Sequence, residues 1–302
     1  MSAESRRSFL TTAALGMTGA ASTAAAPPQE PATSPGGQRL PLRIGHRAAS
    51  MKMVGNFDVF KLARQIPGLD GVELQIAHGQ PNLRDFDAVR RYKREAHRWG
   101  MKIPSLAGVW DRGVSIRHSP VAGINLLQSI RAAEMLGASV ILVAFFRDNA
   151  PDMNDEASYG PVVELLRGAA PRAAEAGVVM GLENSLSPAD NKKLADLVAH
   201  PSVKIYCDMY NFSYYGHADQ IVSGIKLLGN DRICQVHVKN GKRLIEEPGQ
   251  IKDWQALFAA LNEIGYEGWY VFESQHSGNA QLISSTTKNI EYMRKVCRMP
   301  EA

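Results

Sequence analysis

The chain has 302 residues, of which 45% are hydrophobic and 21% charged, and its formal net charge is +4. These values are typical of a folded globular protein and exclude a collagen-like or strongly charged disordered chain. The small net charge, without a long basic run, also argues against a nucleic-acid partner.

The first 26 residues have the order of an export signal. Ser5-Arg6-Arg7-Ser8-Phe9-Leu10 is a twin-arginine pattern, and a mildly apolar run rich in Ala, Thr and Gly follows it to Ala26. This run is too short and too mild for a membrane anchor, so we expect no membrane span. An Ala- and Thr-rich tail without a targeting role is the alternative.

The signal interpretation carries a prediction of location. Residues 1–26 would direct the protein, already folded, through the twin-arginine pathway to the periplasm, with cleavage near Ala24 to Ala26. Residues 27–40 are rich in proline and glycine and are interpreted as a linker. Export in the folded state is compatible with a metal ion loaded in the cytoplasm.

From residue 41 to residue 302, short apolar runs alternate with longer amphipathic segments. The expected strands centre near Ile44, Val72, Ile103, Val140, Val179, Ile205, Val236 and Val271. The expected helices cover residues 57–66, 85–99, 121–136, 160–176, 188–198, 218–228 and 254–264. This alternation predicts one α/β domain, a single (β/α)8 barrel, and the alternative is an open, doubly wound parallel sheet.

Four of the apolar runs end at, or one residue before, a side chain that can bind a metal. These side chains are Glu183, Asp208, His237 and Glu273. A buried carboxylate without a partner costs several kcal/mol or more, and a barrel gathers its functional groups at the carboxyl ends of its strands. We therefore expect the four groups to converge on one divalent cation, for which Mn²⁺, Co²⁺, Mg²⁺ and Zn²⁺ all suit three oxygens and one nitrogen.

The same strand ends resemble a known family. The matching segments are Gly181-Leu182-Glu183-Asn184, Cys207-Asp208-Met209-Tyr210-Asn211, Val236-His237-Val238-Lys239-Asn240 and Tyr270-Val271-Phe272-Glu273-Ser274. They are similar to those of the xylose-isomerase-like TIM barrel superfamily, and within it to the sugar phosphate isomerase/epimerase group that includes ketose 3-epimerases. The resemblance covers about residues 41 to 297.

The resemblance implies roles for the four residues. Glu183, Asp208, His237 and Glu273 would bind one metal ion, with Mn²⁺ favoured. Glu183 and Glu273 would also be the catalytic acid and base on opposite faces of a sugar. They would remove and return a proton beside a carbonyl, through an enediolate.

Three further positions match the family in part. Arg243 lies six residues after His237, where the epimerases have an arginine that contacts substrate. Asn211 lies three residues after Asp208, where those enzymes often have a histidine, and this departure leaves the substrate open. Glu73, at the end of the second expected strand, matches a recurrent acidic position and would bind substrate or pair with a basic side chain in the barrel.

Three more residues are candidate substrate contacts on position alone. Lys239, two residues after His237, shares its strand face and would contact substrate or form a structural ion pair. His46, at the end of the first strand, would line the mouth or lie on a solvated loop. Trp110 would stack on a sugar or pack in the core.

The leading interpretation is a divalent-metal sugar isomerase or epimerase acting on an unphosphorylated keto-sugar, since no glycine-rich phosphate cradle is evident. A lyase or dehydratase on a keto-sugar or 3-keto-glycoside would use the same base and metal. A periplasmic sugar-binding barrel without catalysis is a further alternative. A DNA-repair endonuclease would need several zinc ions and many histidines, which disfavours it. A homodimer is left open.

Overall fold

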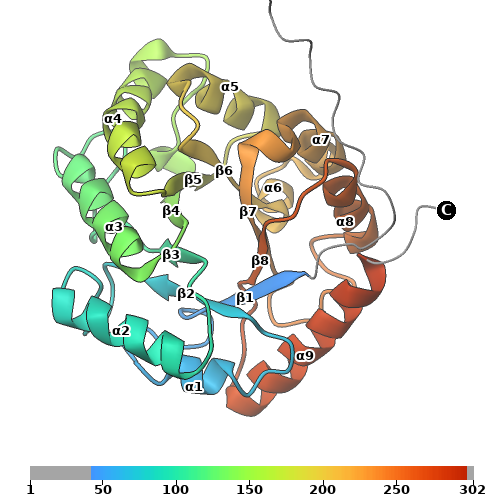
Figure 1. Cartoon of the computed structure of the whole chain (residues 1–302). Helices are drawn as coiled ribbons and strands as arrows, with labels where there is room; N and C mark the ends of the chain where they lie inside the picture. The colour runs from blue at the N-terminus through green and yellow to red at the C-terminus, as the bar shows by residue number, and fades with distance from the viewer. Residues whose placement is uncertain (1–41, 298–302) are drawn as a thin grey trace, which may run out of the picture. The chain divides into compact units, whose positions relative to one another are not determined.

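The computed structural model describes residues 42–297, so the expected signal and linker (residues 1–40) and the ends of the expected barrel domain lie outside the described residues. Eight parallel strands pair in chain order, and the last pairs with the first to close a barrel (Figure 1). They are β1 (Arg43–Arg47), β2 (Gly71–Gln75), β3 (Ser105–Ala107), β4 (Val140–Phe145), β5 (Val179–Asn184), β6 (Val203–Asp208), β7 (Ile233–Val238) and β8 (Trp269–Phe272). The closure confirms the predicted (β/α)8 barrel.

Helices surround the strands as a ring (Figure 1). They are α1 (Val59–Ala63), α2 (Phe86–Arg98), α3 (Ala122–Leu136), α4 (Glu156–Glu175), α5 (Pro188–Val198), α6 (Met209–Tyr214), α7 (Ile221–Arg232), α8 (Trp254–Glu263) and α9 (Asn279–Val296), with the short 3₁₀ helices η1 (Arg147–Asn149) and η2 (Ala218–Gln220). Within residues 42–297, no helix is both long enough and apolar enough to cross a membrane.

The helices depart from the expected ranges in two ways. α6 and α9 were not among the expected helices, and α4 begins at Glu156 rather than at residue 160. The early start of α4 has a local cause, because the Asp155 side chain accepts a hydrogen bond from the amide of Ala157 and caps the helix. By contrast, α3 ends at Leu136 as expected, and Gly137 follows it in the left-handed region at φ 76°.

The third strand lies later in the chain than expected. We expected it near Ile103, but β3 comprises Ser105–Ala107. Pro104 precedes it, and a proline has no amide hydrogen to donate to a neighbouring strand. Regular pairing on both sides therefore begins only after Pro104. The shift places Ser105 inside the barrel, where its hydroxyl bonds the carboxylate of Glu73.

The barrel interior combines a small apolar cluster with buried polar groups. Ala107, Val140, Leu142 and Tyr206 form a cluster separate from the main core between strands and helices. Gly181 leaves room for Tyr206, because a Cβ at position 181 would lie 3.2 Å from the Tyr206 side chain. The Tyr206 ring in turn packs against the His237 ring, with centroids 4.3 Å apart. A small residue on β5 thus helps to place the imidazole.

Candidate metal centre

The four predicted metal ligands lie together at the carboxyl ends of consecutive strands. Glu183 is on β5, Asp208 ends β6, His237 is on β7, and Glu273 directly follows β8. One ligand atom from each lies within 4.8 Å of every other, although the residues span 90 positions of the chain. Asp208 lies directly opposite His237 in the strand register, and Glu273 lies two residues beyond Val271, the partner of His237 on β8.

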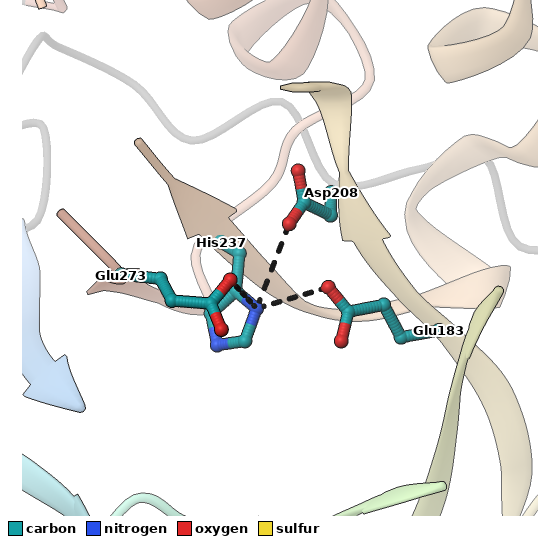
Figure 2. Close-up of side chains that lie close together, drawn as sticks. All are labelled: Glu183, Asp208, His237 and Glu273. Atoms are coloured by element: carbon teal, nitrogen blue, oxygen red, sulfur yellow. Dashed lines mark hydrogen bonds and ion pairs between the residues drawn. The ribbon is translucent and has the colours of Figure 1, made fainter. Parts of the chain in front are cut away.

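One ring nitrogen of His237 faces all three carboxylates (Figure 2). Its Nδ1 lies 3.2 Å from Glu183 Oε1, 3.6 Å from Glu273 Oε2 and 3.8 Å from Asp208 Oδ2. His237 is fully buried, and Asp208 and Glu183 nearly so. A lone pair on this nitrogen would repel the three carboxylate oxygens. A cation placed between the nitrogen and these oxygens would instead be attracted by all four groups. The donor set therefore fits a metal ion.

The opposite ring nitrogen of His237 meets a fourth carboxylate. His237 Nε2 lies 3.3 Å from Glu73 Oε1. The hydroxyls of Ser105 and Tyr206 each donate to Glu73 Oε2 at 2.8 Å. A metal-binding histidine usually donates its remaining N–H to such a carboxylate, which sets the tautomer and leaves the other nitrogen for the metal. Glu73 is thus placed to orient the His237 ring. This arrangement agrees with the alternative in which Glu73 pairs with a basic side chain in the barrel, and not with the one in which it binds substrate.

Two cationic side chains accompany the carboxylates. Lys239 Nζ lies 2.6 Å from both Asp208 Oδ2 and Glu273 Oε2. Arg47 pairs with Glu273 through Nη1 and lies 3.5 Å from Glu73 Oε1 through Nε. With a neutral His237, these four carboxylates and two cations carry two net negative charges. A divalent cation would balance them, and this agrees with the donor set.

The pKa shifts show how strong the negative field is. Burial alone would lower the pKa of His237, but Glu273, Glu73 and Glu183 raise it to about 10. Burial raises the pKa of Glu183 to about 7, with Asp208 and Glu273 adding repulsion against the attraction of His237. Burial would also raise the pKa of Glu273, yet Arg47, His237 and Lys239 hold it well below its usual range. The two glutamates therefore differ sharply in proton affinity.

Asn211 and Arg243 occupy different surroundings. The side-chain Nδ2 of Asn211 donates to Glu183 Oε1 at 2.9 Å, and the backbone amide of Asn211 donates to Asp208 Oδ1 at 2.9 Å. Asn211 thereby holds two of the four candidate ligands. Arg243 is exposed and lines a cavity of about 480 Å³ together with Tyr210, beside the mouth of the barrel. Of the two, Arg243 is the one open to a substrate.

Trp110 is held at the end of a neighbouring strand. Its Nε1 donates to the carbonyl of Ala144 at 2.6 Å, and the half-buried ring packs against the main core. The hydrogen bond joins the loop after β3 to the end of β4. The structure therefore supports the packing interpretation of Trp110.

His46 is enclosed rather than solvated. Its Nε2 lies 3.1 Å from Nε2 of His276, and its Nδ1 lies 3.2 Å from the carbonyl of Arg47. A carbonyl only accepts, so His46 carries its proton on Nδ1 and accepts from His276 through Nε2. The solvated-loop alternative for His46 was wrong, because this residue lies in β1 and is fully buried. Through its contact with the Arg47 carbonyl, His46 helps to fix the backbone of the arginine that pairs with Glu273.

The histidine pair predicts an acid-sensitive stability. Burial and the neighbouring His276 lower the pKa of His46 to about 3, and burial and Lys52 lower that of His276 to about 4. The unfolded chain, with ordinary histidines, binds protons first as the pH falls below about 6.5. The contribution of these two histidines to stability should therefore decline between pH 6.5 and pH 4, by up to about 1.4 kcal/mol per pH unit for each histidine.

Urea unfolding at a series of pH values checks this expectation. His46→Asn should give a shallower decline of the unfolding free energy below pH 6.5 than the wild-type protein. His97→Asn, which changes an exposed histidine on α2, is the matched control and should follow the wild-type curve. Equal slopes for His46→Asn and the wild-type protein would contradict a neutral buried pair.

Arg47 is the main site residue that was not predicted. It is the last residue of β1 and lies opposite Glu73 in the register of β1 and β2. The sequence did contain a signal for this position, because Arg47 ends β1, and the neighbouring strands β2 and β8 end near the carboxylates of Glu73 and Glu273. A guanidinium has no lone pair for a metal ion, so Arg47 does not share the ligand chemistry that marks the other strand ends. Gln235, on β7, is also buried inside the barrel, where its Nε2 donates to the hydroxyls of Ser105 and Tyr206 at 2.7 Å.

Known proteins match both the sequence and the fold. The sequence model of the xylose isomerase-like TIM barrel family matches residues 60–296. A 2-epi-5-epi-valiolone 7-phosphate 2-epimerase of Actinoplanes sp. is 27% identical over 152 residues, which are 49% of this chain and 56% of that protein. The chain thus spans about half the length of this curated relative.

Two solved structures share the fold. The D-allulose 3-epimerase from Methylomonas sp. superposes with a TM-score of 0.67 at 18% identity, covering 84% of this chain and 96% of that one. The 3-keto-D-glucoside 4-epimerase from E. coli also has a TM-score of 0.67 at 18% identity, with 84% and 100% covered. At these identities the likeness establishes the barrel architecture.

Proposed function

Because the chain belongs to the xylose isomerase-like TIM barrel family, we propose that it is a divalent-metal-dependent sugar epimerase or isomerase. The observation that carries the proposal is the placement of Glu183 and Glu273 on two sides of His237, with Asp208 completing the group (Figure 2). Two glutamates that approach one centre from different strands can act on the two faces of a substrate carbon.

The proposed chemistry is a proton transfer beside a carbonyl. One glutamate takes the proton from the carbon, the C–H electron pair moves toward the carbonyl, and an enediolate forms. The other glutamate returns a proton to the opposite face, and the carbon is inverted. A bound divalent ion would supply Lewis-acid polarisation of the carbonyl oxygen. We propose Glu183, Asp208, His237 and Glu273 as its ligands, with Mn²⁺ as the preferred ion.

The remaining residues supply charge and orientation. Lys239 and Arg47 lie next to the carboxylates and would offset negative charge that develops on the substrate oxygen. Glu73 keeps the His237 ring in place through Nε2. Asn211 donates to Glu183 and thereby fixes one of the two proposed bases. Lys239 is the cation best placed to meet a substrate oxygen, because it contacts two ligands at once.

An unphosphorylated keto-sugar is the proposed substrate class. The sequence contains no glycine-rich phosphate cradle. The twin-arginine pattern at Arg6-Arg7 supports a periplasmic location, where we propose that the folded protein works. The E. coli protein of the same fold is, by its description, an epimerase of a 3-keto-glucoside, and this supports a keto-glycoside as the compound to test first.

Deuterium exchange followed by proton NMR tests the proposal. The protein would be incubated in D₂O with D-fructose, D-allulose or a methyl 3-keto-glucoside, with Mn²⁺ or with EDTA, and the samples freed of Mn²⁺ before spectra are recorded. We expect metal-dependent loss of the proton beside the carbonyl with at least one sugar. The product identifies an epimerase, an isomerase or a lyase. Absence of exchange with all three, despite a bound metal ion, would reject the proposal.

A further inference from the structure

A row of aromatic rings lies beside the candidate metal centre at the barrel mouth. We define the aromatic wall as Phe146, Tyr210, Tyr214 and Tyr215. Phe146 precedes η1 in the loop after β4, and the three tyrosines belong to α6 or its end, directly after Asp208. α6 contacts β7 and α7, and it lies inward of the outer helices (Figure 1). The proposed proton transfer does not involve these rings.

The wall is connected to the metal centre through Lys239. Lys239 Nζ, which contacts Asp208 and Glu273, lies 5.5 Å from the centre of the Tyr210 ring. Tyr210 and Tyr214, four residues apart on one helix, stack with centroids 6.5 Å apart and planes at 13°. Tyr214 then meets Tyr215 edge to face at 5.0 Å. The row thus begins at the reaction centre and leads away from it.

The outer end of the wall is held in place yet open to solvent. Tyr215 stacks on Phe146 with centroids 5.7 Å apart. Arg147 adopts the left-handed region at φ 53°, its amide donates to Ser185 Oγ, and its Nη2 donates to Tyr214 Oη at 3.3 Å. A non-glycine residue in this region persists only where its surroundings enforce it. Nevertheless, 53% of Tyr214 is exposed, a large fraction for an aromatic side chain fixed on both sides.

The space next to the wall has the size and lining of a small-molecule site. Tyr210 borders the cavity of about 480 Å³, which is also lined by Asn240, Lys242, Arg243 and Gln250. Small-molecule sites typically have volumes of about 300–1,000 Å³ and combine aromatic surface with a few polar groups. A pyranose ring presents C–H groups on its face and hydroxyls around its edge. Tyr210 offers an aromatic face to the C–H groups, and Lys242 together with the remaining N–H groups of Arg243 offers donors to the hydroxyls.

We propose that the aromatic wall and this cavity bind a second sugar ring, so that the substrate is a keto-glycoside of two rings rather than a free monosaccharide. The keto ring lies at the metal centre, and the ring linked to it stacks on Tyr210 and Tyr214 and meets Arg243 at its edge. This inference rests on the proposed function and specifies its substrate class. Tyr214, which is exposed and stacks on Tyr210, thereby gains a binding role.

Two keto-sugars that differ by one ring provide the test. The probes are methyl 3-keto-glucoside and 3-keto-trehalose, whose second ring has no carbonyl, so exchange reports on the keto ring in both. With Mn²⁺ bound, we expect Tyr214→Ala to raise KM for 3-keto-trehalose on the order of tenfold, with kcat little changed. The ratio of kcat/KM between the two-ring and the one-ring probe should fall by a similar factor.

Matched variants separate ring stacking from general effects. Tyr214→Phe keeps the ring and loses only the hydroxyl contact with Arg147, so it should retain most of the preference for 3-keto-trehalose. Phe86→Ala removes another exposed aromatic side chain, on α2, whose ring contacts Arg131 instead of a residue of the aromatic wall, and should leave both probes unchanged. Metal content and melting temperature of each variant confirm that the fold and the centre are intact.

The outcomes distinguish this inference from the proposed function. If the wild-type protein turns over methyl 3-keto-glucoside and Tyr214→Ala affects both probes equally, or neither, the second-ring site is wrong while the enolisation chemistry stands. If the wild-type protein exchanges neither probe, the proposed chemistry fails. Calorimetric titration with 3-keto-trehalose then still decides the binding site, because only a second-ring site predicts weaker binding to Tyr214→Ala than to the wild-type protein.

Discussion

Glu183→Gln and Glu273→Gln are each expected to lower epimerisation by about 10²- to 10⁴-fold, the contribution usual for a positioned acid or base. Glutamine has nearly the shape of glutamate but accepts no proton at neutral pH. Each substitution therefore removes one of the two proton carriers. Conversion needs both faces of the carbon, so either change should stop it.

Deuterium exchange should respond differently from conversion. In Glu183→Gln, the epimer whose C–H bond faces Glu273 can still lose its proton and regain deuterium on the same face. Glu273→Gln should show the converse preference for the other epimer. Measuring exchange from each epimer separately, by NMR in D₂O, therefore assigns one face of the substrate to each glutamate.

Loss of metal must be separated from loss of a base in these variants. Both glutamates are also candidate ligands, so metal content is measured and rates are compared at saturating Mn²⁺. Glu134→Gln, which changes a surface glutamate paired with Arg172 on a neighbouring helix, is the matched control and should behave as the wild-type protein. Wild-type conversion by either site variant at full metal occupancy would reject the two-base scheme.

The four candidate ligands could be grouped from the sequence because strand ends are a positional signal. A short apolar run predicts a buried strand, and a barrel brings the carboxyl ends of all its strands to one face. Each of these side chains then needs only the correct inward parity, and the register of β6 and β7 places Asp208 opposite His237. Asp208 also accepts from the amide of Asn211 and caps α6, so one residue ends the strand and begins the helix.

Other parts of the site depend on contacts that a single chain segment does not reveal. Arg47 and His46 acquire their roles only where β1 meets β8, which closes the barrel across more than 220 residues of sequence. α6 has six residues and an aromatic-rich sequence, too short for a helical period to appear in the pattern. The aromatic wall is therefore visible only in the positions of the rings in the folded chain, although its three tyrosines closely follow the predicted ligand Asp208 in the sequence.

Binding of Mn²⁺ is expected to raise the melting temperature of the protein by roughly 5–10 °C when free metal exceeds its dissociation constant a hundredfold. A ligand that binds only the folded state contributes about 2.7 kcal/mol at that ratio. For a domain of this size, each kcal/mol corresponds to about 2–4 °C. The physical cause is the cluster of four carboxylates around His237, which Lys239 and Arg47 compensate only in part.

Asp208→Asn should abolish most of this thermal shift while keeping the fold. Asparagine is as good a helix cap as aspartate, so the hydrogen bond from the Asn211 amide to position 208 can persist. The substitution removes one anionic ligand and leaves Lys239 paired with Glu273 alone. Asp196→Asn removes a surface carboxylate that pairs with Lys192 and Arg232, and it should retain the full shift.

Differential scanning fluorimetry with Mn²⁺, Co²⁺, Mg²⁺, Zn²⁺ or EDTA measures the shift for all three proteins. Mn²⁺ should give the largest shift, and EDTA should return the wild-type protein to the melting temperature of Asp208→Asn or below it. An equal shift in Asp208→Asn and the wild-type protein would place the metal elsewhere. Because four groups from four strands share the ion, its removal should weaken the carboxyl ends of β5 to β8 together, and hydrogen exchange at their amides should increase in EDTA.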